Sequence, residues 1–311
     1  MFDILAVTVP FFSVIAAGYG AGRFKVINAD GLNGLNAFVY YFALPAMLFR
    51  VLAVRPIEDI MNWGFLGAWA LAGLSLYALV LVLSRILFRV PVGTAALQAL
   101  AVSFANTGYL GLPLTVSILG EAAAVPVALT LISDMSVSTL LTIGLIELGS
   151  ASGKNLFAHG IKTARAILMN PFFLSIWGGI LWAWFGLPIP GPVSTLLSLL
   201  GSAAGPCALF ALGATLSSHM LAGRLSQSAF MVIGKLFVHP LVVFIVVIFV
   251  VETDPLWTLA ALLNAALPIA GSVYVISQRY QLIVAESSTA ILFSTLFGMF
   301  TVTVLMQVLF S

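Results

Sequence analysis

The sequence predicts an all-α membrane protein in which ten transmembrane helices form two inverted five-helix repeats, with helices four and nine broken at prolines and crossed. Three observations lead to this fold class. Hydrophobic residues make up 62% of the chain and charged residues only 7%, with a mean hydropathy of +1.17, whereas soluble domains carry about 25% charged residues. Ten apolar stretches follow one another along the chain, and matched prolines recur in its two halves.

The ten apolar stretches approach the length of about 20 residues that a helix needs to cross a bilayer. Short connections join nearly all of them. The stretches are Phe2–Gly22, Leu32–Val54, Trp63–Leu87, Thr94–Leu119, Ala122–Leu148, Asn170–Leu187, Val193–Ser218, Ala229–Val251, Leu256–Gln278 and Ile283–Phe310.

Basic residues are distributed unevenly over the loops. Nine of the twelve fall in the loops after spans one, three, five, seven and nine, and these are Arg23, Lys25, Arg85, Arg89, Lys154, Lys162, Arg165, Arg224 and Arg279. Since cytoplasmic loops carry the excess of lysine and arginine, both termini are expected on the non-cytoplasmic side of an inner (plasma) membrane. A net charge of +2 without basic runs gives no indication of nucleic-acid binding.

The repeat is predicted from the prolines. Pro45 follows Pro10 by 35 residues, and Pro206 follows Pro171 by the same interval. The sequences around the prolines also agree, since Pro-Phe-Phe occurs at residues 10–12 and 171–173. An odd number of spans in each half requires the second half to be inverted. The predicted division is a first repeat over residues 1–148, a cytoplasmic linker over 149–169 and a second repeat over 170–311.

The third proline pair, Pro113 and Pro268, marks the predicted site. Proline removes a backbone donor, and Gly108 and Gly111 loosen the backbone before Pro113, so the helix is expected to open there. Each proline can start a half-helix whose N-terminus attracts an anion. The alternative is a pair of ordinary proline kinks. The predicted substrate-binding residues are Asn106, Thr107, Gly111, Leu112, Pro113, Asn264, Leu267, Pro268 and Ile269.

In that interpretation, a substrate carboxylate meets the half-helix N-termini after Gly111 and Leu267. Asn106 and Asn264 lie one to two turns before the prolines and supply hydrogen bonds to the ligand. The alternative role for both amides is a helix-to-helix hydrogen bond without a ligand.

Ionisable residues inside membrane spans are costly and suggest function. Asp134 lies near the middle of span five and is a candidate to carry a coupling proton, although a neighbouring lysine or hydroxyl could hold it in a purely structural role. Lys235 could add countercharge for an anion or could extend to the membrane interface. His239 could titrate near neutral pH or serve as a packing residue.

Other chemistry has little support in the sequence. The three histidines show no metal-ligand spacing, and neither paired carboxylates nor a nucleophile elbow occurs. The phosphate-binding loop of an ATPase is also missing. These observations predict neither an enzyme nor a cofactor or metal site, and they leave a secondary transporter or a channel.

The motifs resemble those of the auxin efflux carrier family, which includes plant auxin carriers and bacterial permeases for malonate or malate. The crossover motifs are the specific part of the resemblance, and the other matches extend it over nearly the whole chain. The matching residues are Asn106-Thr with Gly111-Leu-Pro113, Ala266-Leu-Pro268 with Val273 to Tyr280, Asn36-x-Phe-Val with Ala43-Leu-Pro45, Asn170-Pro171, Ala208 to Gly213, and Lys235 with Pro240.

The resemblance implies a fold similar to those of sodium/proton antiporters and bile-acid transporters. It further implies a homodimer, with a scaffold from spans one, two, six and seven and a moving transport domain from spans three to five and eight to ten. Asn106 matches the crossover asparagine that contacts substrate in the plant carriers. Asp134 has no fixed equivalent in the family, and Asn264 lies nearer its proline than Asn106 does, so these two positions depart from the pattern.

The sequence therefore predicts a secondary transporter that moves a small organic anion, a mono- or dicarboxylate, through the lipid bilayer by alternating access, with a proton as the candidate coupling ion. A sodium-coupled or sodium/proton exchanging transporter of similar fold is the first alternative. A membrane receptor that senses an anion without moving it is the alternative from another class.

Overall fold

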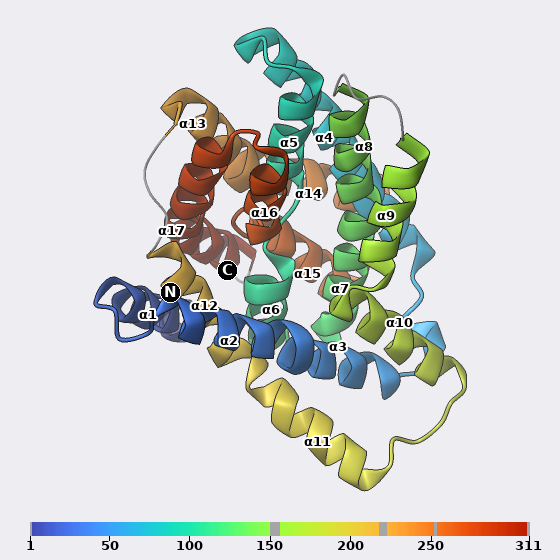
Figure 1. Cartoon of the computed structure of the whole chain (residues 1–311). Coiled ribbons are helices and arrows are strands. Elements are labelled where there is room, and N and C mark those ends of the chain that lie inside the picture. Colours follow the sequence, from blue (N-terminus) through green and yellow to red (C-terminus); the bar gives the residue numbers. More distant parts are fainter. Residues whose placement is uncertain (1, 150–155, 218–222, 252–253, 310–311) are drawn as a thin grey trace. The chain divides into compact units, whose positions relative to one another are not determined.

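A computed structural model describes residues 2–149, 156–217, 223–251 and 254–309, and these residues fold into helices joined by short connections (Figure 1). The described residues contain no strand, and their single β-bridge joins Ala105 and Ile269. The all-α class predicted from the composition is therefore confirmed.

Six helical segments of the described chain are long and apolar enough to cross a membrane, and a bent pair, Gly160–Leu168 with Pro171–Trp184, gives a seventh. Three shorter apolar helices cover Val92–Ser103, Thr107–Leu119 and Pro255–Ala265. The six segments and the bent pair correspond to all the predicted spans except one, four and nine. Spans four and nine are broken into short pieces, and span one is not among the counted segments either, so the ten-span arrangement stays a prediction. The six segments are Ala29–Ala53, Ile57–Phe88, Glu121–Gly149, Gly191–Leu216, Leu225–Phe249 and Val284–Leu309.

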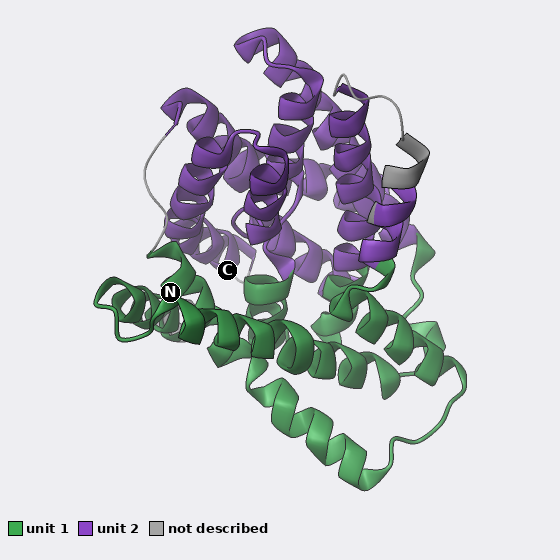
Figure 2. Ribbon diagram, in the orientation of Figure 1, with its two compact units in different colours: residues 1–63, 108–129, 168–219 green, residues 64–107, 130–167, 220–311 purple. Residues whose placement is uncertain are grey.

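The chain divides into two compact units, each assembled from several separate segments (Figure 2). Unit 1 comprises residues 1–63, 108–129 and 168–219, and unit 2 comprises residues 64–107, 130–167 and 220–311. Of the predicted linker, residues 150–155 lie outside the described residues, whereas helix α9 (Leu156–Leu168) covers most of the remainder.

Unit 1 is built mainly from the helices of predicted spans one, two, six and seven. Its elements are α1 (Phe2–Arg23), α2 (Ala29–Phe38), η1 (Val39–Ala43), α3 (Leu44–Ala53), η2 (Ile57–Asp59), most of η3 (Thr107–Gly111), α6 (Leu112–Leu119), η4 (Glu121–Ala123), the first part of α7 (Ala124–Ser133), α10 (Pro171–Trp184), α11 (Gly191–Ser202) and α12 (Ala204–Leu216).

Glycines allow the helices of unit 1 to pack closely. Helix α1 packs against α12, and α3 packs against α10. A Cβ atom added to Gly18 of α1 would lie 2.1 Å from the carbonyl oxygen of Phe210, and one on Gly213 of α12 would lie 1.9 Å from that of Ile15. Small residues at these points bring the helix backbones into contact, as is common between helices in membranes.

Unit 2 contains the rest of the described chain. Its elements are all but the first residue of α4 (Trp63–Phe88), α5 (Val92–Ser103), the end of α7, η5 (Asp134–Ser138), α8 (Thr139–Gly149), all but the last residue of α9, α13 (Leu225–Ile233), η6 (Gly234–Val238), α14 (His239–Phe249), α15 (Pro255–Ala266), α16 (Gly271–Tyr280) and α17 (Val284–Leu309).

Four π-helical turns interrupt the α-helices of the described residues, and three of them end two residues before a proline. These three are η1 before Pro45, η3 before Pro113 and η6 before Pro240. A proline ring clashes with the carbonyl four residues earlier, and a wider turn moves that carbonyl away. The fourth turn, η5, begins at Asp134 and has no proline after it.

Candidate functional site

The candidate site lies in unit 2, where the breaks of two helices pair with each other. Helix α5 ends at Ser103 and α15 ends at Ala266, and the residues after each are extended. Ala105 and Ile269 form an antiparallel bridge. The Asn106 N–H donates to the Pro268 carbonyl over 2.9 Å, and the Ala270 N–H donates to the Phe104 carbonyl over 3.2 Å. The two breaks therefore satisfy part of each other's backbone hydrogen bonding.

The first break lies earlier in the chain than the sequence predicts. The helix was expected to open between Gly108 and Pro113, but that segment is helical, because η3 leads directly into α6. The π-helical turn accommodates Pro113 without opening the helix, so the non-helical residues are 104–106 instead. The half-helix therefore begins at Thr107, and the expectation that it begins after Gly111 is wrong.

The second half-helix begins later than predicted. Pro268 lies inside the break, and α16 starts at Gly271, so the expectation that Pro268 starts the half-helix is also wrong. Its N-cap residue, Ala270, has no side chain that could bond the first N–H groups. Gly271 and Ser272 are exposed. The start of α16 is thus a helix N-terminus whose first donors have no side-chain cap, and such ends favour negative charge.

The two predicted asparagines differ in their surroundings. The side chain of Asn106 is 7% exposed and makes no hydrogen bond to another residue that the structure describes. Asn264 is fully buried, its Nδ2 donates to Thr130 Oγ1 over 2.8 Å, and its Oδ1 has no partner among the described residues. Asn106 is therefore the better candidate for contact with a ligand, whereas Asn264 holds two helices together.

The remaining predicted substrate-binding residues divide between the two units. Thr107, Leu267, Pro268 and Ile269 are buried in unit 2 around the paired breaks, and the Ile269 N–H donates to Ser294 Oγ over 3.1 Å. The other three belong to unit 1, and they are Gly111, Leu112 and Pro113. The structure thus brings together six of the nine predicted residues within unit 2.

Asp134 lies in η5 and is 3% exposed. Its Oδ1 accepts a hydrogen bond from Trp69 Nε1 over 2.8 Å, while its Oδ2 is buried without a partner among the described residues. Lys235 interacts with Asp134 electrostatically. The carboxyl group is therefore held at one oxygen and free to carry a proton, or to bond a water molecule, at the other.

Lys235 is fully buried in η6. Its Nζ lies 2.6 Å from His239 Nδ1 and donates to the Ala265 carbonyl over 2.9 Å. The interpretation in which Lys235 extends to the membrane interface is wrong, because this ammonium group is anchored near the C-terminal end of α15, where the helix dipole favours a cation. The His239 ring is also buried and lies 5.7 Å from that of Trp69.

Two residues of unit 2 that bond predicted site residues, Trp69 and Thr130, are not predicted from the sequence. Trp69 and Thr130 bond the two predicted residues Asp134 and Asn264. Thr130 could have been found, because it lies four residues before Asp134 and therefore on the same helix face. Trp69 carries no local signal that would distinguish it from a packing aromatic residue.

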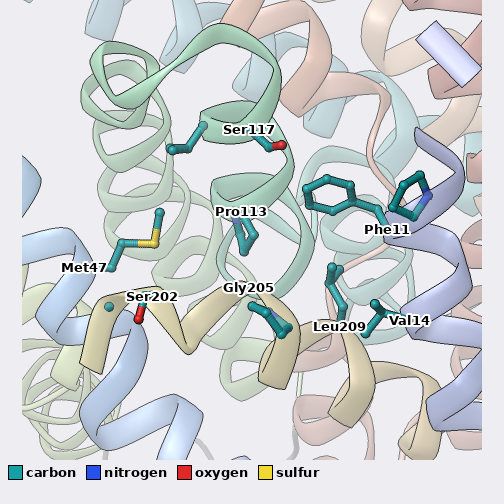
Figure 3. Close-up of a pocket in the computed structure, with 12 residues that line it drawn as sticks. Phe11, Val14, Met47, Pro113, Ser117, Ser202, Gly205 and Leu209 are labelled. Atoms are coloured by element: carbon teal, nitrogen blue, oxygen red, sulfur yellow. The ribbon is translucent and has the colours of Figure 1, made fainter. Parts of the chain in front are cut away.

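Unit 1 contains a separate apolar pocket with a volume of about 310 Å³ (Figure 3). Phe11, Met47 and Leu209 contribute apolar surface, and Pro113 of α6 also lines it. The only hydroxyl side chains among its lining residues are Ser117 and Ser202, and none of these residues is charged. The pocket alone therefore offers little to bind a carboxylate.

The fold and the site define a multi-pass membrane protein whose interior holds broken helices and buried ionisable groups. Residues 3–306 match the family model described as "Membrane transport protein". The chain belongs to this family, the auxin efflux carrier family, and is therefore a membrane transporter and not an enzyme. The resemblance predicted from the proline motifs is confirmed.

Relatives from bacteria and plants extend the comparison. A protein of Rhizobium meliloti (strain 1021) named "Putative malonate transporter" is 32% identical over 311 residues, which cover 100% of this chain and 97% of that protein. An uncharacterized transporter of Escherichia coli (strain K12) is 25% identical over 253 residues, or 76% of each chain. Auxin efflux carrier component 2 of Oryza sativa subsp. japonica is 25% identical over 173 residues, covering 55% of this chain and 26% of the rice protein.

Proposed function

We propose that the protein is a secondary transporter that moves small organic anions, mono- or dicarboxylates, across the inner membrane by alternating access. The observation that carries this proposal is the backbone pairing of the two helix breaks through Asn106 and Pro268. Non-helical backbone is tolerated at membrane depth only where it is buried in protein or lines a cavity, and discontinuous helices indicate transporter sites.

The chemistry of the breaks favours an anion. The uncapped start of α16 supplies N–H donors with partial positive charge, and Asn106 adds an amide without a partner in the described chain. The breaks themselves contain no carboxylate that would attract sodium. The relative from Rhizobium meliloti is named for malonate, which agrees with a short dicarboxylate as substrate.

Helix packing in unit 1 supports the inverted repeat. Span one (α1) packs on the second part of span seven (α12), and span six (α10) packs on the second part of span two (α3). Exchanging the two halves of the chain converts one of these pairs into the other. The same relationship is required if residues 1–148 and 170–311 are inverted repeats.

The division of the chain into two compact units supports the proposed scaffold and transport domain. Unit 1 gathers spans one, two, six and seven, and unit 2 gathers spans three, eight, nine and ten. Spans four and five divide between the units, because residues 108–129 group with unit 1. The homodimer and the placement of both termini outside the cytoplasm rest on the family resemblance and on the distribution of basic loops.

Coupling to a proton is assigned to Asp134. Its unpartnered Oδ2 can bind and release a proton, and Lys235 and His239 provide the charged and titratable surroundings. This assignment predicts sodium-independent transport, in contrast to a sodium-coupled carrier of similar fold.

The first experiment identifies the substrate. A thermal-shift screen of the purified protein against short carboxylates, malonate included, is followed by counterflow of the radiolabelled hit in proteoliposomes. Asn106→Ala is expected to abolish uptake without unfolding the protein, and Asn33→Ala on the exposed surface of α2 is the matched control. Normal uptake by Asn106→Ala would remove this residue from the site. Binding without counterflow would indicate a receptor instead.

A further inference from the structure

The span that contains Asp134 carries a row of buried polar side chains along one face. We propose that the part of this row that follows Asp134 conducts protons between Asp134 and the inner end of α8. The inference rests on the proposed function, which makes Asp134 the proton-coupling group. It adds the residues that deliver the proton and the side of the membrane from which the proton comes.

The row consists of Thr130, Asp134, Ser138 and Thr142, which follow one another at four-residue intervals. None of these side chains is more than 4% exposed. Residues four apart lie on the same face of a helix, so the row crosses the interior of unit 2. Polar groups at such positions are costly in a membrane protein unless they interact with one another or with water.

The helix widens where the row passes Asp134. The π-helical turn η5 spans Asp134–Ser138, and unlike the other three π-helical turns of the described chain it precedes no proline. Turns of this type frequently occur at functional sites. Sterics of a proline therefore do not explain the widening here.

The carboxyl group has one oxygen available for a proton. Trp69 occupies Oδ1, and Oδ2 is buried without a partner among the described residues. Lys235 of η6 interacts with the carboxyl group electrostatically, and His239 of α14 contacts Lys235 and the Trp69 ring. Neither side chain forms a hydrogen bond to Oδ2, which leaves this oxygen for proton exchange.

Tyr77 of α4 extends the row, because its hydroxyl forms a hydrogen bond with Thr142. Thr142 Oγ1 donates to the Ser138 carbonyl over 2.7 Å. Because its single proton is used there, the bond of 2.9 Å between Thr142 Oγ1 and the Tyr77 hydroxyl has Tyr77 as donor. A hydroxyl both donates and accepts, so it can take up one proton while releasing another. The Ser138 carbonyl cannot pass a proton on, so the Thr142 hydroxyl has to turn away from it during transfer. Thr142 then takes a proton from Tyr77 and releases its own toward Asp134 through water, while Tyr77 regains a proton from the Glu147 side. Each O–H bond that breaks is thereby replaced by one that forms.

The row ends near the last turn of α8. Glu147 Oε1 accepts from the Tyr280 hydroxyl over 2.9 Å, and both residues are half-buried. Thr142 and Glu147 are separated by about 7.5 Å along the helix axis, a gap that one or two bridging waters can span. This end adjoins the loops rich in basic residues, so the inferred proton exchange is with the cytoplasm.

The test uses the full chain in proteoliposomes with a trapped pH dye and radiolabelled malonate. In the Tyr77→Phe/Thr142→Val double variant, malonate-driven proton movement is expected to slow at least fivefold. Counterflow requires no net release of the proton, so it should stay within twofold of wild type. Tyr19→Phe and Thr303→Val, which remove hydroxyls outside the row, should leave both measurements unchanged.

Four outcomes would overturn the inference. Unchanged proton movement in the double variant, with proton movement lost in Asp134→Asn, would show another route to Asp134. Equal losses of counterflow and proton movement would show a structural role for the hydroxyls. Wild-type counterflow without proton movement would reject the row and the proton coupling assigned to Asp134, but it would leave the proposed transport of an organic anion intact. Absence of counterflow with malonate and every other short carboxylate would reject the proposed function itself, and the row with it.

Discussion

The backbone N–H of Asn106 donates to the carbonyl of Pro268 over 2.9 Å, joining two helix breaks that lie far apart in the sequence. The bond, with the neighbouring bridge between Ala105 and Ile269, provides partners for backbone groups that would otherwise be costly in a membrane. Because the backbone of Asn106 is used in this way, its side chain is left for other contacts. The first N–H groups of α16 are likewise left for other contacts, because no side chain caps them.

The hydrogen bond between Asn264 and Thr130 is expected to stabilise unit 2. Hydrogen bonds between helices in membranes contribute about 0.5–1.5 kcal/mol. Asn264→Ala and Thr130→Val should each lower the free energy of unfolding, measured in mixed micelles. The double variant should lose less than the two single losses together, because both substitutions remove the same bond.

Additive losses for Asn264→Ala and Thr130→Val would show that the 2.8 Å contact contributes nothing measurable. Thr303→Val is a suitable control, because its hydroxyl bonds a carbonyl of its own helix. Combined with Asn264→Ala, it should give additive effects.

The sequence predicts which residues meet at the breaks better than it predicts where the breaks lie. Asn106 and Pro268 could be singled out because polar and helix-breaking residues are rare in apolar stretches. The position of the first break could not be predicted from Pro113, because a π-helical turn accommodates a proline as readily as a break does. The partners of Lys235 were equally hidden, since His239 is four residues away but Ala265 belongs to another helix.

Asp134 and Lys235 are expected to respond differently to neutralisation. Lys235→Met leaves the Asp134 carboxylate buried beside no cation, and breaking a buried charge pair typically costs about 3–5 kcal/mol. Asp134→Asn keeps an oxygen for the Trp69 indole, so it should destabilise the protein less. Thermal unfolding of the purified variants measures the difference.

The double variant Asp134→Asn/Lys235→Met should be more stable than Lys235→Met alone, because the uncompensated carboxylate is gone. If the double variant is the less stable of the two, the pair does not interact in the folded protein. Substrate-driven proton movement should be absent from every variant that lacks the carboxyl group.

Close packing of α1 on α12 can be tested with two glycines of one helix. Gly18→Ala places a methyl group against the Phe210 carbonyl, and overpacking of this kind costs about 1–3 kcal/mol. Gly20→Ala meets no atom within 4 Å and should be neutral or slightly stabilising, because alanine favours a helix by about 1 kcal/mol. A melting temperature that falls equally in both variants would exclude the close contact as the cause.

Pro113 controls the turn that leads out of the first break. Pro113→Ala restores a backbone donor, so η3 is expected to contract to an α-helical turn. The turn then holds one residue fewer, although the chain keeps its length. The residues before it, Asn106 and Thr107, would then rotate by about 100° around the helix axis. Uptake should fall at least tenfold while the protein remains folded, as judged by its melting temperature. Pro126→Ala, in the first turn of α7 where proline is tolerated, should transport normally. Normal uptake by Pro113→Ala would mean that the wide turn does not set the position of Asn106.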